Sequence, residues 1–245
     1  MRLNFLDLLR GIAVFSMVIY HFFWDLGFFG YIDISLVTSG LGLASAQIIG
    51  SSFILISGFS LSIFRSRENN ERKFWMRFLK LLVLSLLISF VTKIFDPRNF
   101  IFFGILHLLT FCSLIGFIIL KQKKPYLFFL LLVASLFASL KNLQFELPYY
   151  LAWIGLNVIV PNSGDFYPVL PWIVFYLIGI WLGNFFYKLI EKKQKNFYQK
   201  NLKKKGLLYN SLLISGRNSL MIYILHQPVF FSLFLLLNRI MSNGI

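Results

Sequence analysis

Four ionisable side chains lie in or beside the first hydrophobic stretch of the chain: Asp7, Arg10, His21 and Asp25. Such groups are costly to place in a hydrophobic segment, so each marks a candidate site. Arg10 and His21 are eleven residues apart, which on a helix predicts one shared face and a separation of about 16 Å. Asp25 is spaced to orient the imidazole of His21, a natural general base. Asp7 and Arg10, at i and i+3, are spaced to form an ion pair, which competes with a ligand-binding role for Arg10.

Two further histidines, His107 and His226, lie in later hydrophobic stretches. Each one alone fits a hydrogen bond between helices as well as it fits a catalytic role. Together with His21 they predict a polar cavity that opens toward the outer side of a membrane. Pro228, which follows His226 closely, removes a helical hydrogen bond and predicts a kink at that point.

Two arginines, Arg65 and Arg67, directly follow the second hydrophobic stretch. Their planar guanidinium groups suit phosphate binding, although membrane topology alone also places basic residues there. The stretch before them, residues 41–64, is rich in Gly and Ser and is typical of a closely packed helix. Cys112 is the only cysteine, which excludes a disulfide framework and a cysteine-based metal site. We expect no metal.

The composition excludes a soluble globular protein. Of the 245 residues 58% are hydrophobic and only 13% are charged, and the mean hydropathy is +0.75. So few charged side chains cannot cover the surface of a soluble domain, whereas a lipid bilayer solvates an apolar exterior. The net charge of +15 is explained by basic loops at the membrane surface, so nucleic acid is not expected as a partner.

The sequence therefore predicts an all-α, polytopic membrane helix bundle in a single domain, residues 1–245. Spans of about 20 apolar residues give about seven transmembrane helices. The expected spans are Leu3–Trp24, Leu41–Phe64, Phe78–Phe95, Ile101–Leu120, Tyr126–Leu140, Val169–Tyr187 and Asn218–Asn238.

Charge sets the expected orientation. With seven spans and a cytoplasmic N-terminus, only four of the 24 lysines and arginines lie on the outer side, as the positive-inside rule requires. These four are Lys93, Arg98, Lys141 and Arg239. Residues 188–217 then form a basic cytoplasmic loop, with a flexible Lys-rich part over residues 191–205. Residues 145–168 form an external loop, either re-entrant or interfacial.

Five segments carry a resemblance to a known family. They are LDLLRGIAVFSMVIYHFFWDL at 6–26, ISGFSLS at 56–62, FFGILHLL at 102–109, FYPVLPWIVFYLIGIWLG at 166–183 and GRNSLMIYILHQPVF at 216–230. The chain resembles the bacterial family related to the catalytic domain of heparan-alpha-glucosaminide N-acetyltransferase. That family is part of a wider group of transmembrane acyltransferases, in which ten residues separate an Arg from a His on the first helix and an Arg-x-Arg follows the second.

The resemblance implies acyl transfer, acetyl in the first instance, from cytoplasmic acyl-CoA to a glycan or lipid-linked acceptor outside. It implies the plasma membrane of a bacterium. His21 would be catalytic, with Asp25, His107 and His226 as further candidates, and the donor phosphates would meet the arginines at positions 10, 65 and 67. The loop 25–40 lacks the histidine that the eukaryotic lysosomal enzyme has there, so the resemblance does not extend to the heparan substrate or to an acetyl-histidine.

Other functions remain open at this point. A transporter or flippase would also use a polar cavity and a kinked last helix, but the chain shows no duplicated half. A haem protein would use pairs of histidines. A retinal protein is disfavoured because the last span has no lysine. Asp165, Tyr167 and Trp172 in and after the expected external loop fit contact with a sugar as well as they fit loop packing.

Overall fold

The computed structural model describes residues 3–67, 70–122, 125–138, 145–200 and 206–243. This part of the chain is helical and divides into two compact units, which are described separately. The first unit contains Met1–Phe53 and Gln194–Ile245, and the second contains Ile54–Lys193. Two long helices, α3 (Gly40–Arg67) and α7 (Val169–Lys200), contribute residues to both.

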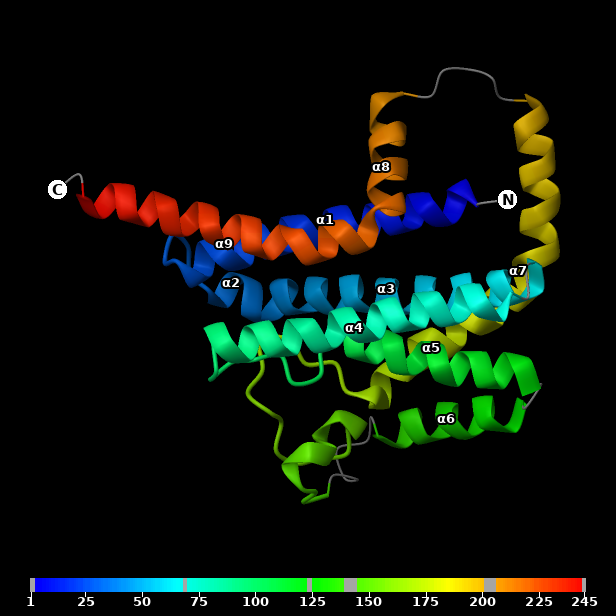
Figure 1. Ribbon diagram of the computed structural model, residues 1–245, viewed down its shortest axis with the longest axis horizontal. Coiled ribbons are helices and arrows are strands. Elements are labelled where there is room, and N and C mark those ends of the chain that lie inside the picture. Colours follow the sequence, from blue (N-terminus) through cyan, green and yellow to red (C-terminus); the bar gives the residue numbers. More distant parts are fainter. Residues whose placement is uncertain (1–2, 68–69, 123–124, 139–144, 201–205, 244–245) are drawn as a thin grey trace. The chain divides into compact units, whose positions relative to one another are not determined.

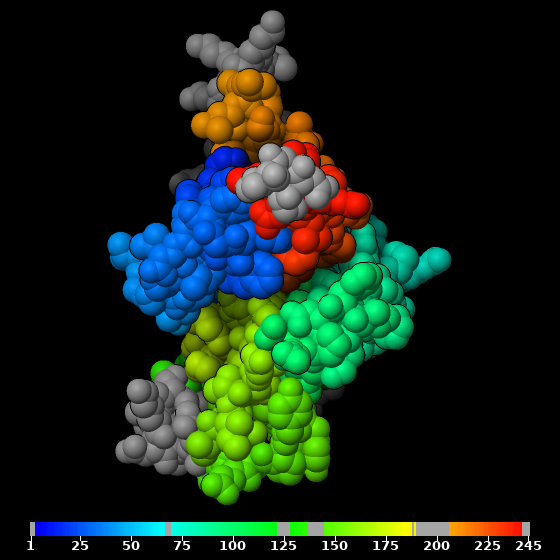
Figure 2. All heavy atoms as spheres, turned by 90° about the vertical axis from the view of Figure 1, so that its left-hand side faces the viewer, coloured from blue at the N-terminus to red at the C-terminus, as the bar shows by residue number. Residues whose placement is uncertain are grey.

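The first unit is organised around α1 (Asn4–Phe28). This helix packs against three others: α2 (Ser35–Thr38), α8 (Leu207–Arg217) and α9 (Ser219–Asn243). In Figure 1, α9 runs alongside α1, and α8 crosses the end of α1 that lies nearest the N-terminus. The space-filling view in Figure 2 shows the blue first helix in direct contact with the red last helix.

The buried side of α1 follows a helical spacing. Its buried residues are Leu6, Asp7, Gly11, Ala13, Val14, Met17, Asp25 and Gly27, and those at 7, 11, 14 and 17 follow one another at intervals of three or four positions. Apolar side chains at such intervals form one stripe of the helix. Asp7 and Asp25, near the two ends, are the charged members of the stripe. Arg10 and His21, which were predicted to share a face of this helix, are only partly buried.

A very close contact joins α1 to α8. A methyl group added at Gly216 would overlap the backbone carbonyl oxygen of Asp7, and one added at Gly11 would overlap that of Leu212. Glycine at both positions lets the two backbones meet, in the manner of small residues between membrane helices. This contact places the C-terminal end of α8 beside the first turns of α1.

The second unit contains α4 (Glu71–Phe95), α5 (Ile105–Gln122), α6 (Pro125–Ala138) and a short 3-10 helix, η2 (Tyr149–Ile154). Helix α5 packs against α4 and α6. The α3 and α7 segments of this unit also approach closely, because Gly58 and Gly179 each face a backbone carbonyl of the other helix. The α3 part of the Gly- and Ser-rich stretch in this unit thus packs closely, as the sequence predicted.

Five helices among the described residues are long and apolar enough to cross a membrane: α1, α3, α4, α7 and α9. They match five of the seven expected spans. Helix α5 is a shorter apolar helix, and α6 has 14 described residues. The chain is thus a polytopic helical membrane protein, and the number of seven spans stays a prediction.

The expected cytoplasmic loop, residues 188–217, differs from the structure. Helix α7 continues through the basic stretch to Lys200, and α8 begins at Leu207. Lys, Gln and Glu are good helix formers, so a polar sequence without hydrophobic periodicity can still extend an existing helix. Residues 201–205 lie outside the described residues. By contrast, the described residues of 145–168 contain only η2 and isolated β-bridges to Phe103 and within the segment, as expected of a loop.

Candidate active site

Two of the predicted histidines lie side by side in the first unit. The ring centroids of His21 on α1 and His226 on α9 are 4.8 Å apart, with the rings tilted by 58°. We refer to them as the histidine pair; both side chains are partly buried. They are 205 positions apart in the sequence, and the packing of α9 along α1 brings them together.

Hydrogen bonds define the orientation of His226. Its Nδ1 lies 2.7 Å from the carbonyl oxygen of Tyr223 and 3.2 Å from that of Ile222. A carbonyl only accepts, so Nδ1 carries the proton and, in the neutral ring, Nε2 is left with a lone pair. That Nε2 is buried and, like the buried Nδ1 of His21, has no hydrogen-bond partner among the described residues. The pair thus presents at least one nitrogen able to accept a proton.

A polar residue follows each histidine of the pair on its own helix: Asp25 follows His21 on α1, and Gln227 follows His226 on α9. Asp25, fully buried, is one turn after His21, and its Oδ1 accepts a hydrogen bond of 2.8 Å from Nε2 of Gln227. The sequence predicted that Asp25 would orient His21 directly. Among the described contacts its partner is instead Gln227, which sequence reasoning did not single out.

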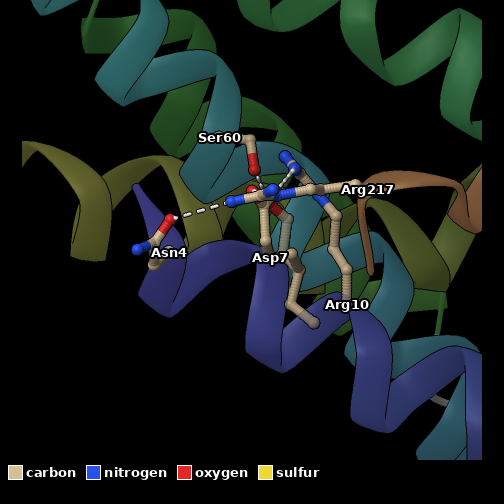
Figure 3. Close-up of polar contacts among 6 residues, drawn as sticks. Asn4, Asp7, Arg10, Ser60 and Arg217 are labelled. Carbon is tan, nitrogen blue, oxygen red and sulfur yellow. Dashed lines mark hydrogen bonds and ion pairs between the residues drawn. The ribbon is translucent and has the colours of Figure 1, made fainter. Parts of the chain in front are cut away.

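Three charged side chains meet at the other end of α1 (Figure 3). Asp7 is 1% exposed and lies 3.1 Å from Nη1 of Arg10 and 3.6 Å from Nε of Arg217, which comes from α8. Arg217 also donates to Oδ1 of Asn4, at 3.4 Å. The predicted ion pair between Asp7 and Arg10 is present, and Arg217 is a second cation that the sequence analysis missed. The side chains of Arg10 and Arg217 remain 28% and 45% exposed, so their outer edges stay accessible.

His107 belongs to the second unit and has a different environment. The backbone N–H of Gly104 donates to its Nδ1 at 3.2 Å, and Ser89 Oγ lies 3.1 Å from its Nε2. Because Ser89 donates its own proton to the carbonyl of Ile101, Nε2–H of His107 must be the donor to Ser89. Both ring nitrogens are therefore occupied, which favours the structural interpretation of this histidine.

Arg65, at the end of α3, also lies in the second unit. Its guanidinium carbon is 5.0 Å from the centre of the Phe117 ring, and Lys121 Nζ lies 5.6 Å from the same ring. Lys121 pairs with Glu71 at 2.8 Å. The buried Nη1 of Arg65 has no hydrogen-bond partner within the described part of the chain. Arg67 ends α3, and its side chain lies outside the described part.

Asp165 holds the start of α5 to the segment before α7. Its Oδ2 accepts the backbone N–H of Ile105 at 2.9 Å, and its own carbonyl accepts the hydroxyl of Ser163 at 2.8 Å. Phe102 N–H in turn donates to Ser163 Oγ at 3.2 Å. Asp165 was considered for contact with a sugar, and these bonds support the alternative of loop packing.

The titration of Asp165 should affect stability. Burial raises the pKa of its carboxyl from 3.8 to about 6, while the hydrogen bond from Ile105 acts in the opposite direction. The folded protein therefore keeps this proton to a higher pH than the unfolded chain, and the contribution of the group to stability falls as the pH rises from 3.8 to about 6. We expect the Tm of the wild type in detergent to fall over this pH range. Asp165→Asn keeps an oxygen acceptor but does not titrate, so its Tm should fall less. Identical profiles for both proteins would contradict this assignment.

No group of three or more His, Cys, Asp or Glu side chains suited to a metal ion occurs among the described residues.

A family model described as heparan-alpha-glucosaminide N-acetyltransferase, catalytic, matches residues 2–228. The match spans most of the chain, from before α1 to Pro228 in α9, and includes both histidines of the pair. The chain belongs to this family. Neither a curated protein nor a solved structure matches it.

Membership of the heparan-alpha-glucosaminide N-acetyltransferase catalytic family confirms the resemblance noted from the sequence. It makes the protein a member of a transferase family, and its apolar helices make it a multi-pass membrane protein. The matched residues include all seven positions that the sequence analysis assigned to catalysis or donor binding.

Proposed function

We propose that the protein transfers an acyl group, acetyl in the first instance, from cytoplasmic acyl-CoA to a glycan or lipid-linked acceptor on the outer side of the membrane. The observation that carries this proposal is the histidine pair, His21 and His226, which has a buried, unoccupied proton-accepting nitrogen. Family membership supports the transfer reaction. Membrane histidines also occur in transporters, so it is the family membership that favours transfer over transport.

The reaction needs a base at the acceptor. The pair removes a proton from the acceptor's N–H or O–H group as its nitrogen or oxygen attacks the thioester carbonyl. The tetrahedral intermediate then collapses, the carbon–sulfur bond breaks, and the CoA thiolate leaves. The protonated histidine returns the proton to this thiolate, so the site ends in its starting state.

The donor phosphates bind at the other end of α1. Arg10 and Arg217 share one carboxylate, Asp7, so the cluster keeps an excess positive charge, and part of each guanidinium is exposed. Planar guanidinium groups bind phosphate oxygens in pairs. Arg10 and His21 are about 16 Å apart along α1, so the donor's arm must bridge this separation. In the second unit, Arg65 is a further candidate for the phosphates.

The test is transfer in proteoliposomes. Labelled acetyl-CoA is supplied on the side of the basic loops, with glucosamine and glucose as acceptor probes on the other side. We expect label on an acceptor with the wild type, and a donor KM raised about tenfold or more in Arg10→Ala, since a charged hydrogen bond to phosphate is lost. Arg98→Ala, which removes a positive charge on the expected outer side, is the control. Acceptor movement without labelling would favour a transporter and overturn the proposal.

A further inference from the structure

Several buried polar atoms beside the histidine pair lack a partner. They are Oδ2 of Asp25, Oε1 of Gln227, Nε2 of His226 and Nδ1 of His21, all in the first unit, and none of them has a hydrogen bond within the described residues. They come from two adjacent turns of α1 and two consecutive residues of α9. Buried polar groups are nearly always hydrogen-bonded, so a group of four without partners needs an explanation.

Three of these atoms are acceptors. A carboxylate only accepts, which defines Oδ2 of Asp25. Gln227 donates from Nε2 to Asp25, so its Oε1 points away from that bond and accepts. Nε2 of His226 accepts because Nδ1 donates to the carbonyl of Tyr223. Asp25 and Gln227 therefore satisfy one another at one atom each, and the three acceptors are left without an N–H or O–H donor among the described residues.

We infer that Asp25 and Gln227 together bind the acyl acceptor, through an N–H- or O–H-bearing part that lies next to the histidine pair. Asp25 contacts the donor group of the acceptor. Gln227 is a positioning residue, since its hydrogen bond holds Oδ1 of Asp25 and leaves Oδ2 free to face the ligand. This inference rests on the proposed function and adds the acceptor side of the site to it.

The charge of the cluster restricts the acceptor. A ligand group that supplies several N–H or O–H donors, such as a sugar or an ammonium group, satisfies the acceptors. An anionic group would face the carboxylate of Asp25 at a buried position, where repulsion between like charges is strong. The acceptor part that enters the site is therefore neutral or cationic.

A swap of the two side chains tests the arrangement. In Asp25→Asn/Gln227→Glu the amide moves to α1 and the carboxylate to α9, so the hydrogen bond between them and both outward acceptors are retained. In Asp25→Asn alone, the amide nitrogen of one partner must face the ligand as a donor. In Gln227→Glu alone, two carboxylates face each other. In the single variants, loss of an acceptor-binding pair should raise the KM for the acceptor alone. Loss of a purely structural pair should raise the KM values for donor and acceptor together.

The measurement is initial-rate kinetics of acetyl transfer with glucosamine as the probe, with KM obtained separately for acceptor and donor. We expect each single variant, and Gln227→Ala, to raise the acceptor KM at least tenfold with the donor KM within twofold of wild type. The double variant should return the acceptor KM to within about threefold. Asn238→Ala is the matched control, because it removes another amide on α9, which accepts from the hydroxyl of Tyr31 at 2.6 Å.

The outcomes separate the two proposals. If the wild type transfers acetyl groups but the single variants keep its acceptor KM, the inference about Asp25 and Gln227 is wrong while the proposed function stands. If donor and acceptor KM rise together, or the double variant fails to recover although it folds, the pair is structural and the inference is wrong. If the wild type transfers to no probe, the proposed function itself fails.

Discussion

His21→Ala is expected to lower kcat for acyl transfer by about 10²–10⁴-fold, the usual contribution of a positioned general base. The reason is the geometry of the histidine pair. His21 and His226 are in contact, with ring centroids 4.8 Å apart, and both have a buried nitrogen without a partner in the described structure. Removing one imidazole takes away half of the proton-accepting group. Donor binding, about 16 Å away along α1, should be unchanged within about twofold.

The third histidine, His107, provides the control for this prediction. His107 has both ring nitrogens occupied by Ser89 and Gly104, so His107→Ala should lower Tm and leave kcat per folded molecule near wild type. Single-turnover rates with labelled acetyl-CoA, and donor binding measured separately by equilibrium dialysis, check both variants. If His21→Ala and His107→Ala reduced kcat equally, the pair would have no special part in the chemistry.

The spacing of nearby residues predicted the features that lie within a single helix. The i, i+3 spacing anticipated the ion pair between Asp7 and Arg10. Hydropathy anticipated the five long apolar helices. These features depend on the 3.6-residue period and on side-chain polarity, both of which can be read from consecutive residues.

Contacts between distant segments could not be read in this way. Arg217 reaches Asp7 only because two glycines let α8 meet α1, and Gln227 reaches Asp25 only because α9 lies along α1. Two weak signals were present: the Gly216–Arg217 dipeptide, and an amide directly after a membrane histidine. It also could not be predicted that both ring nitrogens of His107 have hydrogen-bond partners, since one partner is a serine of another helix.

Gly216→Ala is the prediction with the largest expected effect on stability. A methyl group at this position would overlap the backbone carbonyl of Asp7, which belongs to a helix and cannot move aside as a flexible side chain would. The α1–α8 contact must open to accept it, at a cost of about 1–3 kcal/mol, which lowers Tm by roughly 5 °C. Arg217 is the next residue, so the same shift should also weaken its ion pair with Asp7.

Gly206→Ala provides the matched control for this substitution. Gly206 precedes α8 with φ of −58°, and a methyl group there would meet no atom within 4 Å. The two variants add the same atoms at the two ends of one helix. A difference between their losses of stability therefore measures the effect of the close contact between α1 and α8. We expect Gly206→Ala to lose at most a few tenths of a kcal/mol, because the poorer N-cap is offset by the smaller conformational entropy that alanine loses on folding at this ordinary φ. Thermal unfolding in detergent compares both with wild type, and an undiminished Tm for Gly216→Ala would show that α1 and α8 do not meet as closely as described. Because the arginines that we propose to bind the donor lie at this contact, Gly216→Ala should also raise the donor KM, whereas Gly206→Ala should not.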